Sequence, residues 1–300
     1  MPETKSTHRV VCFGETLWDF LPTGKEAGGA PMNVAYHLRQ LGLDPALISR
    51  IGLDEEGKQL IEVLDAKHIN TDYFQLDYEA PTGKVIAEFN ADREASYTIL
   101  NRVAWDNIQW EDSLPALVSN ADYFIFGSLA ARSRTSCETL LQLISLARTK
   151  VLDINLRQPF FDRQIVERLI SCADILKLNL SELELITGWF SPLKNETDRI
   201  RTLKDRFGLK TVILTKGKDG AILNIGEEFY HHAGYEVKAV DTVGSGDAFL
   251  AAIIRQLIDR SPPEQALEFA CRLGAFVATR KGACPAYSQN DLETYFSNQE

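Results

Sequence analysis

The sequence has little of what would tie it to an oxidising compartment or to a membrane. Its five cysteines are odd in number and scattered, and no two of them form a C-x-x-C pair. Such cysteines indicate reduced thiols and argue against a disulfide framework or a zinc site. No apolar run approaches the about 18 residues of a membrane span, and residues 1–9 lack the apolar core of a signal peptide. We therefore expect a cytoplasmic protein with no membrane partner.

Basic residues are also scarce. The chain has 32 Lys and Arg against 42 Asp and Glu, which gives a formal net charge of −10. A nucleic-acid partner requires a basic face, so we expect none. The chain also lacks Gly-x-Gly-x-x-Gly after its first apolar strand, where Gly14-Glu15-Thr16 stands instead. This argues against a dinucleotide-dependent dehydrogenase. A nucleotide substrate remains compatible, because a local site can be positive on an acidic protein.

What the sequence does contain is a glycine loop that opens an apolar helix. Residues 241–247 read Asp-Thr-Val-Gly-Ser-Gly-Asp and precede an apolar run. Gly244 and Gly246 permit backbone conformations that side chains would obstruct, and the N–H groups at a helix start attract anions. Asp247, on the first turn, suits a phosphoryl-transfer site, where a group must take the proton of the attacking hydroxyl. The alternative is a glycine-rich turn whose aspartate only stabilises the helix start.

Two stretches resemble signatures of one enzyme family. Residues 241–247 resemble Asp-Thr-x-Gly-Ala-Gly-Asp of the ribokinase-like (PfkB-type) sugar kinases, with Ser245 where alanine is commonest. Residues 28–35 read Gly-Gly-Ala-Pro-Met-Asn-Val-Ala and look like that family's first signature. By itself, the second stretch also fits a turn followed by a helix that ends near Gly42. The motifs occur in the family's order, and with three weaker matches they span nearly the whole chain.

The order of strands and helices predicts an α/β fold with a parallel sheet. Residues 82–89 and 95–99 read instead as two strands across a turn at Asn90–Arg93, which interrupts the alternation. The resemblance implies that this insertion is a lid over the sugar. It also implies a ribokinase-like three-layer α/β/α domain with a mostly parallel central sheet and a small β-sheet lid. We expect a single domain over residues 1–300, with lid segments at about 15–29 and 71–104.

The resemblance also implies which residues hold the sugar. Asp19 follows the first strand, as the family's sugar-binding aspartate does, and Arg102 follows the lid insertion. A surface ion pair is an equal alternative for Arg102. The sequence Asp-Ile-Asn-Leu-Arg at residues 153–157 ends another strand, and ligands of open α/β sheets bind outside such ends. The predicted substrate-binding residues are Asp19, Gly29, Asn33, Arg102, Asn155 and Arg157.

Other segments resemble the family's nucleotide side. Residues 215–220 contain Thr-Lys-Gly-x-x-Gly, and Gly282 lies in a loop like the one beneath the adenine. Cys271 and Arg272 stand near the position where other family members often have an asparagine that contacts the base. Ala286 stands near the position where some members have a polar ligand for a monovalent cation. The sequence therefore leaves open both the contacts to the base and activation by K⁺. The predicted nucleotide-binding residues are Asn179, Thr215, Lys216, Gly217, Gly220, Thr242, Gly244, Gly246 and Gly282.

A metal site is implied by Asn179 and Glu182. Asn-x-x-Glu matches the family's motif for organising Mg²⁺ through water. A cation that keeps most of its waters needs only one or two carboxylates. The alternative is purely structural, because these residue types at a helix start also stabilise the helix.

The resemblance implies an ATP-dependent sugar kinase whose partners are a small sugar and ATP. Asp247 would act as the base, and the N–H groups of Gly244, Ser245 and Gly246 would stabilise the transferring group. Gly14, Asp19 and the 153–157 stretch look most like fructokinases and predict D-fructose going to fructose 6-phosphate. Kinases of 2-keto-3-deoxygluconate, ribose or a nucleoside are alternatives, as is a non-catalytic sugar or nucleotide sensor. A homodimer through the β lid is a further open alternative.

Overall fold

The computed structural model describes residues 9–21, 24–89 and 95–297. The chain forms two compact units. The first comprises residues up to Ala35, Leu43–Phe126 and Ala130–Lys150, and the second comprises Tyr36–Gly42, Gly127–Leu129 and the chain from Val151 onward. Helix α1, Ala30–Gln40, begins in the first unit and ends in the second.

The first unit contains a parallel sheet with the strand order β8-β1-β4-β5. Its elements are β1 Val10–Phe13, β4 Ala46–Gly52, β5 Phe74–Asp77, β8 Tyr123–Gly127, α2 Glu55–Ala66, η1 Ala104–Asn107, α3 Leu114–Asn120, η2 Leu129–Ala131 and α4 Arg134–Leu146. Val11, Cys12 and Phe13 of β1 are fully buried. An inner strand of a parallel sheet is covered on both faces, which explains why β1 is a continuous apolar run.

A second, smaller sheet has the order β3-β2-β6-β7. Its strands are β2 Leu17–Leu21, β3 Gly24–Gly28, β6 Gly83–Phe89 and β7 Ala95–Ile99. The predicted strand pair is confirmed, because β6 and β7 run antiparallel with Val85 opposite Ile99. The predicted turn at residues 90–93 lies outside the described residues. Strand β5 falls within a predicted lid segment but pairs with β4 of the larger sheet.

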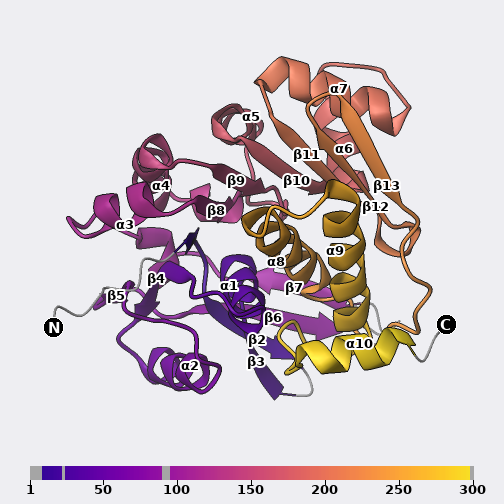
Figure 1. The fold of residues 1–300 in the computed structure, drawn as a ribbon. Helices are drawn as coiled ribbons and strands as arrows, with labels where there is room; N and C mark the ends of the chain where they lie inside the picture. Colours follow the sequence, from indigo (N-terminus) through magenta and orange to yellow (C-terminus); the bar gives the residue numbers. More distant parts are fainter. Residues whose placement is uncertain (1–8, 22–23, 90–94, 298–300) are drawn as a thin grey trace, which may run out of the picture. The chain divides into compact units, whose positions relative to one another are not determined.

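The second unit has the strand order β13-β12-β11-β10-β9. Its elements are β9 Lys150–Asp153, α5 Arg163–Cys172, β10 Ile175–Asn179, α6 Leu180–Gly188, α7 Glu196–Phe207, β11 Thr211–Thr215, η3 Gly217–Asp219, β12 Ala221–Ile225, β13 Glu228–His232, α8 Ser245–Ile258, α9 Pro263–Ala278 and α10 Gln289–Ser297. Strands β9, β10 and β11 are parallel, and β12 and β13 form a hairpin across Gly226 and Glu227. Helices α8 and α9 lie side by side (Figure 1).

Several helices follow from local signals, and others do not. Helix α4 follows from apolar residues at helical spacing, since its buried residues include Leu140, Leu143 and Ile144. Asp54 caps α2, because its carboxylate accepts the Gly57 amide hydrogen at 2.7 Å. The spacing of apolar residues does not predict helix α7. Within the described chain, its only buried residues are Ile200 and Leu203. Two buried positions in three turns give too weak an apolar stripe.

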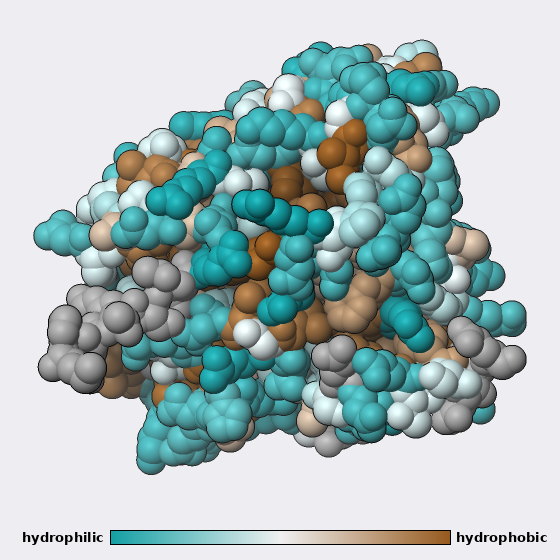
Figure 2. All heavy atoms as spheres, in the orientation of Figure 1, coloured by the Kyte–Doolittle hydropathy of each residue, from teal (hydrophilic) through white to brown (hydrophobic). Residues whose placement is uncertain are grey.

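The surface agrees with the acidic, charged composition. Figure 2 shows polar and charged residues over most of the visible face, with apolar residues in small groups between them. Across the described ranges, none of the helices combines the length and apolarity that a membrane crossing requires.

Candidate active site

The N-terminus of α8 is open to a ligand. Gly244 precedes it with a φ of 77°, and a Cβ there would lie 2.6 Å from Cα of Ala283, so only glycine fits. No side chain caps this helix. Ser245 donates its N–H to the Thr242 carbonyl at 3.3 Å, whereas the Gly246 N–H has no acceptor among the described residues. Asp247 is half-buried on the first turn. The helix start thus combines an anion-attracting dipole with one carboxylate.

The loop that contains Gly282 lies against the loop before α8. The Asp241 carboxylate accepts the N–H of Val243 at 3.0 Å and that of Gly282 at 3.1 Å. The Ala278 carbonyl accepts the Val240 N–H at 2.8 Å. Two segments that the sequence analysis assigned to the nucleotide are therefore held together by one aspartate.

A buried ion pair that the sequence analysis missed lies beside this helix start. Lys177 on β10 donates to Asp153 on β9 at 2.6 Å, and both side chains are less than a tenth exposed. A Cβ on Gly246 would lie 3.2 Å from Nζ of Lys177, so the amine is close to the first turn of α8. Burial alone would lower the pKa of Lys177, but the charges of Asp153 and Asp247 outweigh burial and raise it. The available signal was a single lysine inside the apolar strand 175–178.

The N-terminus of α6, in contrast, is closed by its own side chains. Asn179 Oδ1 accepts the Glu182 N–H at 2.9 Å, and Glu182 Oε2 accepts the Asn179 N–H at 2.8 Å. Glu182 Oε1 accepts the Leu156 N–H at 2.8 Å. Burial raises the pKa of Glu182. Asn179 and Glu182 therefore stabilise the start of α6, as the structural alternative predicts. Each carboxylate oxygen of Glu182 still has a second lone pair that can accept a hydrogen bond from water.

The donor set near α6 fits only a hydrated cation. Within the described residues, no three His, Cys, Asp or Glu side chains converge as a metal site would require. Asn179 is exposed and Glu182 is buried with both oxygens engaged, so direct ligation by this pair alone would leave most of the coordination to water. Mg²⁺ commonly binds in this way.

The glycines of the 215–220 loop serve its fold. A Cβ on Gly220 would lie 1.9 Å from the carbonyl oxygen of His232, so the loop and the residues after β13 cross at backbone contact. The Lys216 amine lies 3.2 Å from Glu196 at the start of α7. The Thr215 hydroxyl donates to the Leu178 carbonyl at 3.5 Å, and Gly217 adopts a φ of 59°.

The 153–157 segment lies beside the start of α6. Asn155 adopts a left-handed φ of 41°, and the next residue, Leu156, donates its N–H to Glu182. Arg157 is exposed. The segment is thus held to the Glu182 side chain by the residue after Asn155, while Arg157 is exposed to solvent.

In the first unit, the predicted sugar residues gather at the start of α1. The Asp19 carboxylate lies over Gly28, because a Cβ there would come within 2.1 Å of Oδ2. Gly29 has a φ of 118°, and a Cβ on it would meet the Glu15 carbonyl oxygen at 2.3 Å. Asn33 is 5% exposed and donates its backbone N–H to Gly29. Glu15, which the sequence analysis did not assign, accepts the Ala30 N–H at 3.3 Å.

Arg102 takes no part in the contacts that join Asp19, Gly29 and Asn33. It is exposed, adopts a φ of 55°, and lines a cavity of about 780 Å³ together with Arg50 and Asp77. Its assignment to the sugar stays a prediction.

A model of the pfkB family of carbohydrate kinases matches residues 7–290. The chain belongs to this family. A fructokinase from Solanum tuberosum is 29% identical over 307 residues, which cover 94% of this chain and 93% of the relative. The predicted family is therefore confirmed, and the chain is a sugar kinase.

Solved structures confirm the predicted ribokinase-like fold class. A crystal structure of fructokinase with bound ATP from Xylella fastidiosa has a TM-score of 0.85 at 22% identity, covering 97% of this chain and 99% of that one. A fructokinase double mutant from Vibrio cholerae, in a fructose-, ADP- and potassium-bound form, has a TM-score of 0.82 at 22% identity, covering 96% and 98%. This pfkB kinase thus has the fold of enzymes that share only about a fifth of its residues.

Proposed function

We propose that this pfkB kinase transfers the γ-phosphoryl group of ATP, bound with Mg²⁺, to D-fructose and forms fructose 6-phosphate. The observation that carries the proposal is the start of α8, which has no side-chain cap and holds Asp247 on its first turn. Open N–H groups suit an anion, and a neighbouring carboxylate suits removal of a proton. Together they favour phosphoryl transfer over simple phosphate binding.

Asp247 accepts the proton of the attacking hydroxyl in this proposal. The N–H groups of Gly244, Ser245 and Gly246 stabilise the transferring group, and Ser245 would first release its long bond to Thr242. Asn179 and Glu182 would hold the hydrated Mg²⁺, which neutralises charge on the phosphates when bound.

The acceptor site would be formed by Asp19, Gly29 and Asn33. A carboxylate, a side-chain amide and exposed backbone groups around one helix start can bind several sugar hydroxyls. Strands β2, β3, β6 and β7 would cover the sugar and keep water from competing as acceptor. D-fructose is the first candidate, because the potato relative is named a fructokinase and the Vibrio structure contains fructose.

The test is ADP release from Mg·ATP with D-fructose, 2-keto-3-deoxygluconate and D-ribose, in K⁺ and in Na⁺ buffer. Asp247→Asn should lower kcat by about 10²–10⁴-fold with D-fructose, because it removes the general base. Asp259→Asn is the matched control, since it removes a carboxylate at the other end of α8, where Asp259 pairs with Arg255. The control should keep its turnover.

Each other result has a defined meaning. Near-normal turnover in Asp247→Asn would refute the assignment of the base. Turnover with another sugar would keep the transfer mechanism and replace the acceptor. Saturable ATP binding without turnover on any sugar would support the sensor alternative. Equal rates in K⁺ and Na⁺ would exclude activation by K⁺.

A further inference from the structure

A cavity of about 780 Å³ that is lined mainly by polar and charged residues lies within the first unit. Its walls come from the end of β4, the residues after β5, the residues after β7, η1 and the start of α4. The volume is within the roughly 300–1,000 Å³ of small-molecule sites. None of the residues in its lining has a role in the function proposed above, although the sequence predicted that Arg102 binds the sugar.

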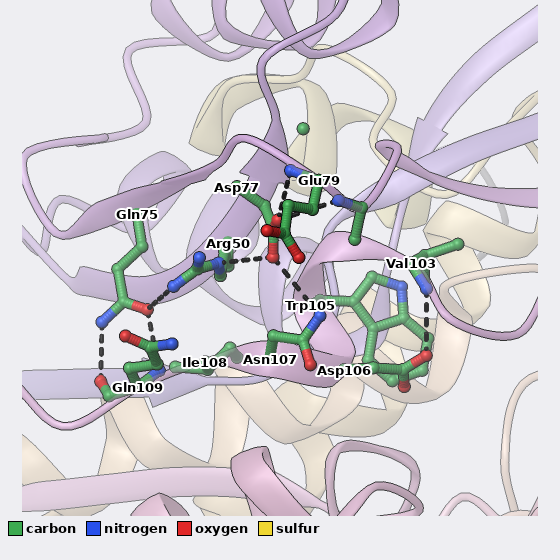
Figure 3. A network of polar contacts seen from close by, with 12 residues as sticks. Arg50, Gln75, Asp77, Glu79, Val103, Trp105, Asp106, Asn107, Ile108 and Gln109 are labelled. Atoms are coloured by element: carbon green, nitrogen blue, oxygen red, sulfur yellow. Dashed lines mark hydrogen bonds and ion pairs between the residues drawn. The ribbon is translucent and has the colours of Figure 1, made fainter.

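One wall is a buried ion pair whose carboxylate is fully occupied (Figure 3). Arg50 Nε donates to Asp77 Oδ2 at 2.9 Å, with the side chains 13% and 6% exposed. The other oxygen of Asp77 accepts the N–H groups of Glu79 and Ala80 at 2.9 and 2.8 Å. Gln75 accepts a weak 3.4 Å contact from Nη1 of Arg50. Nη2 of Arg50 has no acceptor among the described residues, so it can serve a ligand.

A second part of the lining contacts the small sheet through Trp105. Arg132 binds Asp106 through two nitrogens at 2.7 and 2.9 Å, and its guanidinium lies 3.8 Å from the ring centre of Trp105. Trp105 is fully buried, and a Cβ on Gly83 of β6 would meet its ring nitrogen at 2.5 Å. Gly83 pairs with Leu17 of β2, the strand that carries Asp19. Trp105 therefore contacts both Arg132 of this wall and the strand that pairs with β2.

The rim carries two charges that these pairs do not neutralise. Arg102 and Glu79 are both exposed, and neither side chain has an ion pair or hydrogen bond with another described residue. Arg102 has a left-handed backbone, which non-glycine residues seldom adopt and which is enriched at ligand sites. Side-chain amides of Asn101 and Gln109 also line the cavity. The free groups are thus guanidinium donors for an anion, with a carboxylate and amides for hydroxyls.

We propose that this cavity is a second ligand site, which binds a hydroxylated anion of the sugar-phosphate class through Arg102 and Arg50. Glu79 and the amides would receive the hydroxyl groups. The anion site follows from the cavity itself. The choice of a sugar phosphate rests on the proposed function, because a sugar kinase releases a product of this class.

Calorimetric titration of the whole chain with fructose 6-phosphate tests the proposal. The wild type should bind two molecules per chain, one at the acceptor site and one in the cavity. Arg102→Ala should bind one. Arg148→Ala is the matched control, because Arg148 is an exposed arginine of the same unit outside the cavity, and it should bind two. Gluconate added before the titration shows whether a carboxylate can replace the phosphate.

A second variant tests the charge at the rim, and it is expected to strengthen anion binding where Arg102→Ala weakens it. Glu79→Gln removes the uncompensated negative charge, so it should tighten the binding of inorganic phosphate by about two- to fivefold. Unchanged or weaker phosphate binding in this variant would contradict the placement of the anion near Glu79.

Two results would overturn the second site. One is a single fructose 6-phosphate per wild-type chain, with Arg102→Ala raising the KM for the sugar, because the cavity would then belong to the acceptor site. The other is two molecules bound by Arg102→Ala. Absence of sugar phosphorylation by the wild type would instead refute the proposed function, and the phosphate titrations of Arg102→Ala and Glu79→Gln would still decide on the anion site.

Discussion

Helices α6 and α8 of the second unit differ in whether a side chain accepts hydrogen bonds from the N–H groups of their first turn. Helix α6 closes its start with reciprocal bonds between Asn179 and Glu182, whereas α8 begins at Gly244 without any side-chain cap. At a capped helix start, side chains of the helix accept hydrogen bonds from its N–H groups, whereas at an uncapped start these N–H groups can bind a ligand. The comparison separates a motif that stabilises a helix from one that is open to chemistry, although both match signatures of the same family.

The largest expected effect is at the open start. Gly244→Ala places a Cβ 2.6 Å from Ala283 and forces an L-residue to a φ of 77°. Both displace the N–H groups and Asp247, and a shift of about 1 Å in a catalytic group costs roughly 10²-fold in rate. We expect kcat to fall at least about 10²-fold, measured as ADP release.

Gly208→Ala is the control for that substitution. Gly208 ends α7 with a φ of 70°, and nothing lies within 4 Å of its missing Cβ. It should lose about 1 kcal/mol of stability in urea unfolding and keep its kcat. Equal loss of activity in both variants would show that the loss comes from general destabilisation and not from the displacement of the α8 start.

The closed start should respond mainly in stability. Glu182→Gln replaces one accepting oxygen with an amide nitrogen, so either the Asn179 or the Leu156 N–H loses its acceptor. We expect a loss of about 1–3 kcal/mol in the free energy of unfolding. If Glu182 also holds hydrated Mg²⁺, the Mg²⁺ concentration for half-maximal activity should rise.

Glu184→Gln serves as the control on the same helix, because Glu184 is exposed. An unchanged Mg²⁺ requirement in Glu182→Gln, beside a loss of stability, would reduce the motif to a helix cap and remove its proposed metal role.

The smallest effect should come from α2, whose cap is ionised. Asp54 accepts hydrogen bonds from Gly57 and from the amide and hydroxyl of Thr82. Burial would raise its pKa, but these bonds and Lys84 hold it below the usual 3.8. A lowered pKa stabilises the fold above about pH 3.8, and this stability is lost as the pH falls through the folded-state pKa.

Asp54→Asn should therefore unfold more easily at neutral pH, by about 1 kcal/mol, and its stability should vary less with pH below 4. Asp65→Asn, at the exposed end of α2, should retain the wild-type pH dependence. Parallel pH curves of the wild type and Asp54→Asn would contradict the ionised cap.

Elements with strong local signals were predictable, and those without them were not. The β6 and β7 strands and helices α1 and α8 follow from periodicity and from glycine, proline and turn residues. Helices α3, α5, α7 and α10 were not predicted from the sequence. The same is true of η1, which is only four residues long. Short or mostly polar segments depend on what packs against them, so their periodicity carries little information.

Parts of the candidate site were likewise predictable from local sequence, and other parts were not. The sequence by itself determined the glycine loop at Gly244 and the carboxylate at Asp247, because backbone conformation and N–H direction depend on residues a few positions apart. Only the tertiary structure decided that Lys177 pairs with Asp153, 24 positions away, and that Arg102 lines a cavity together with Arg50 and Asp77. Contacts between distant segments depend on strand order and packing, and no local pattern of residues specifies them.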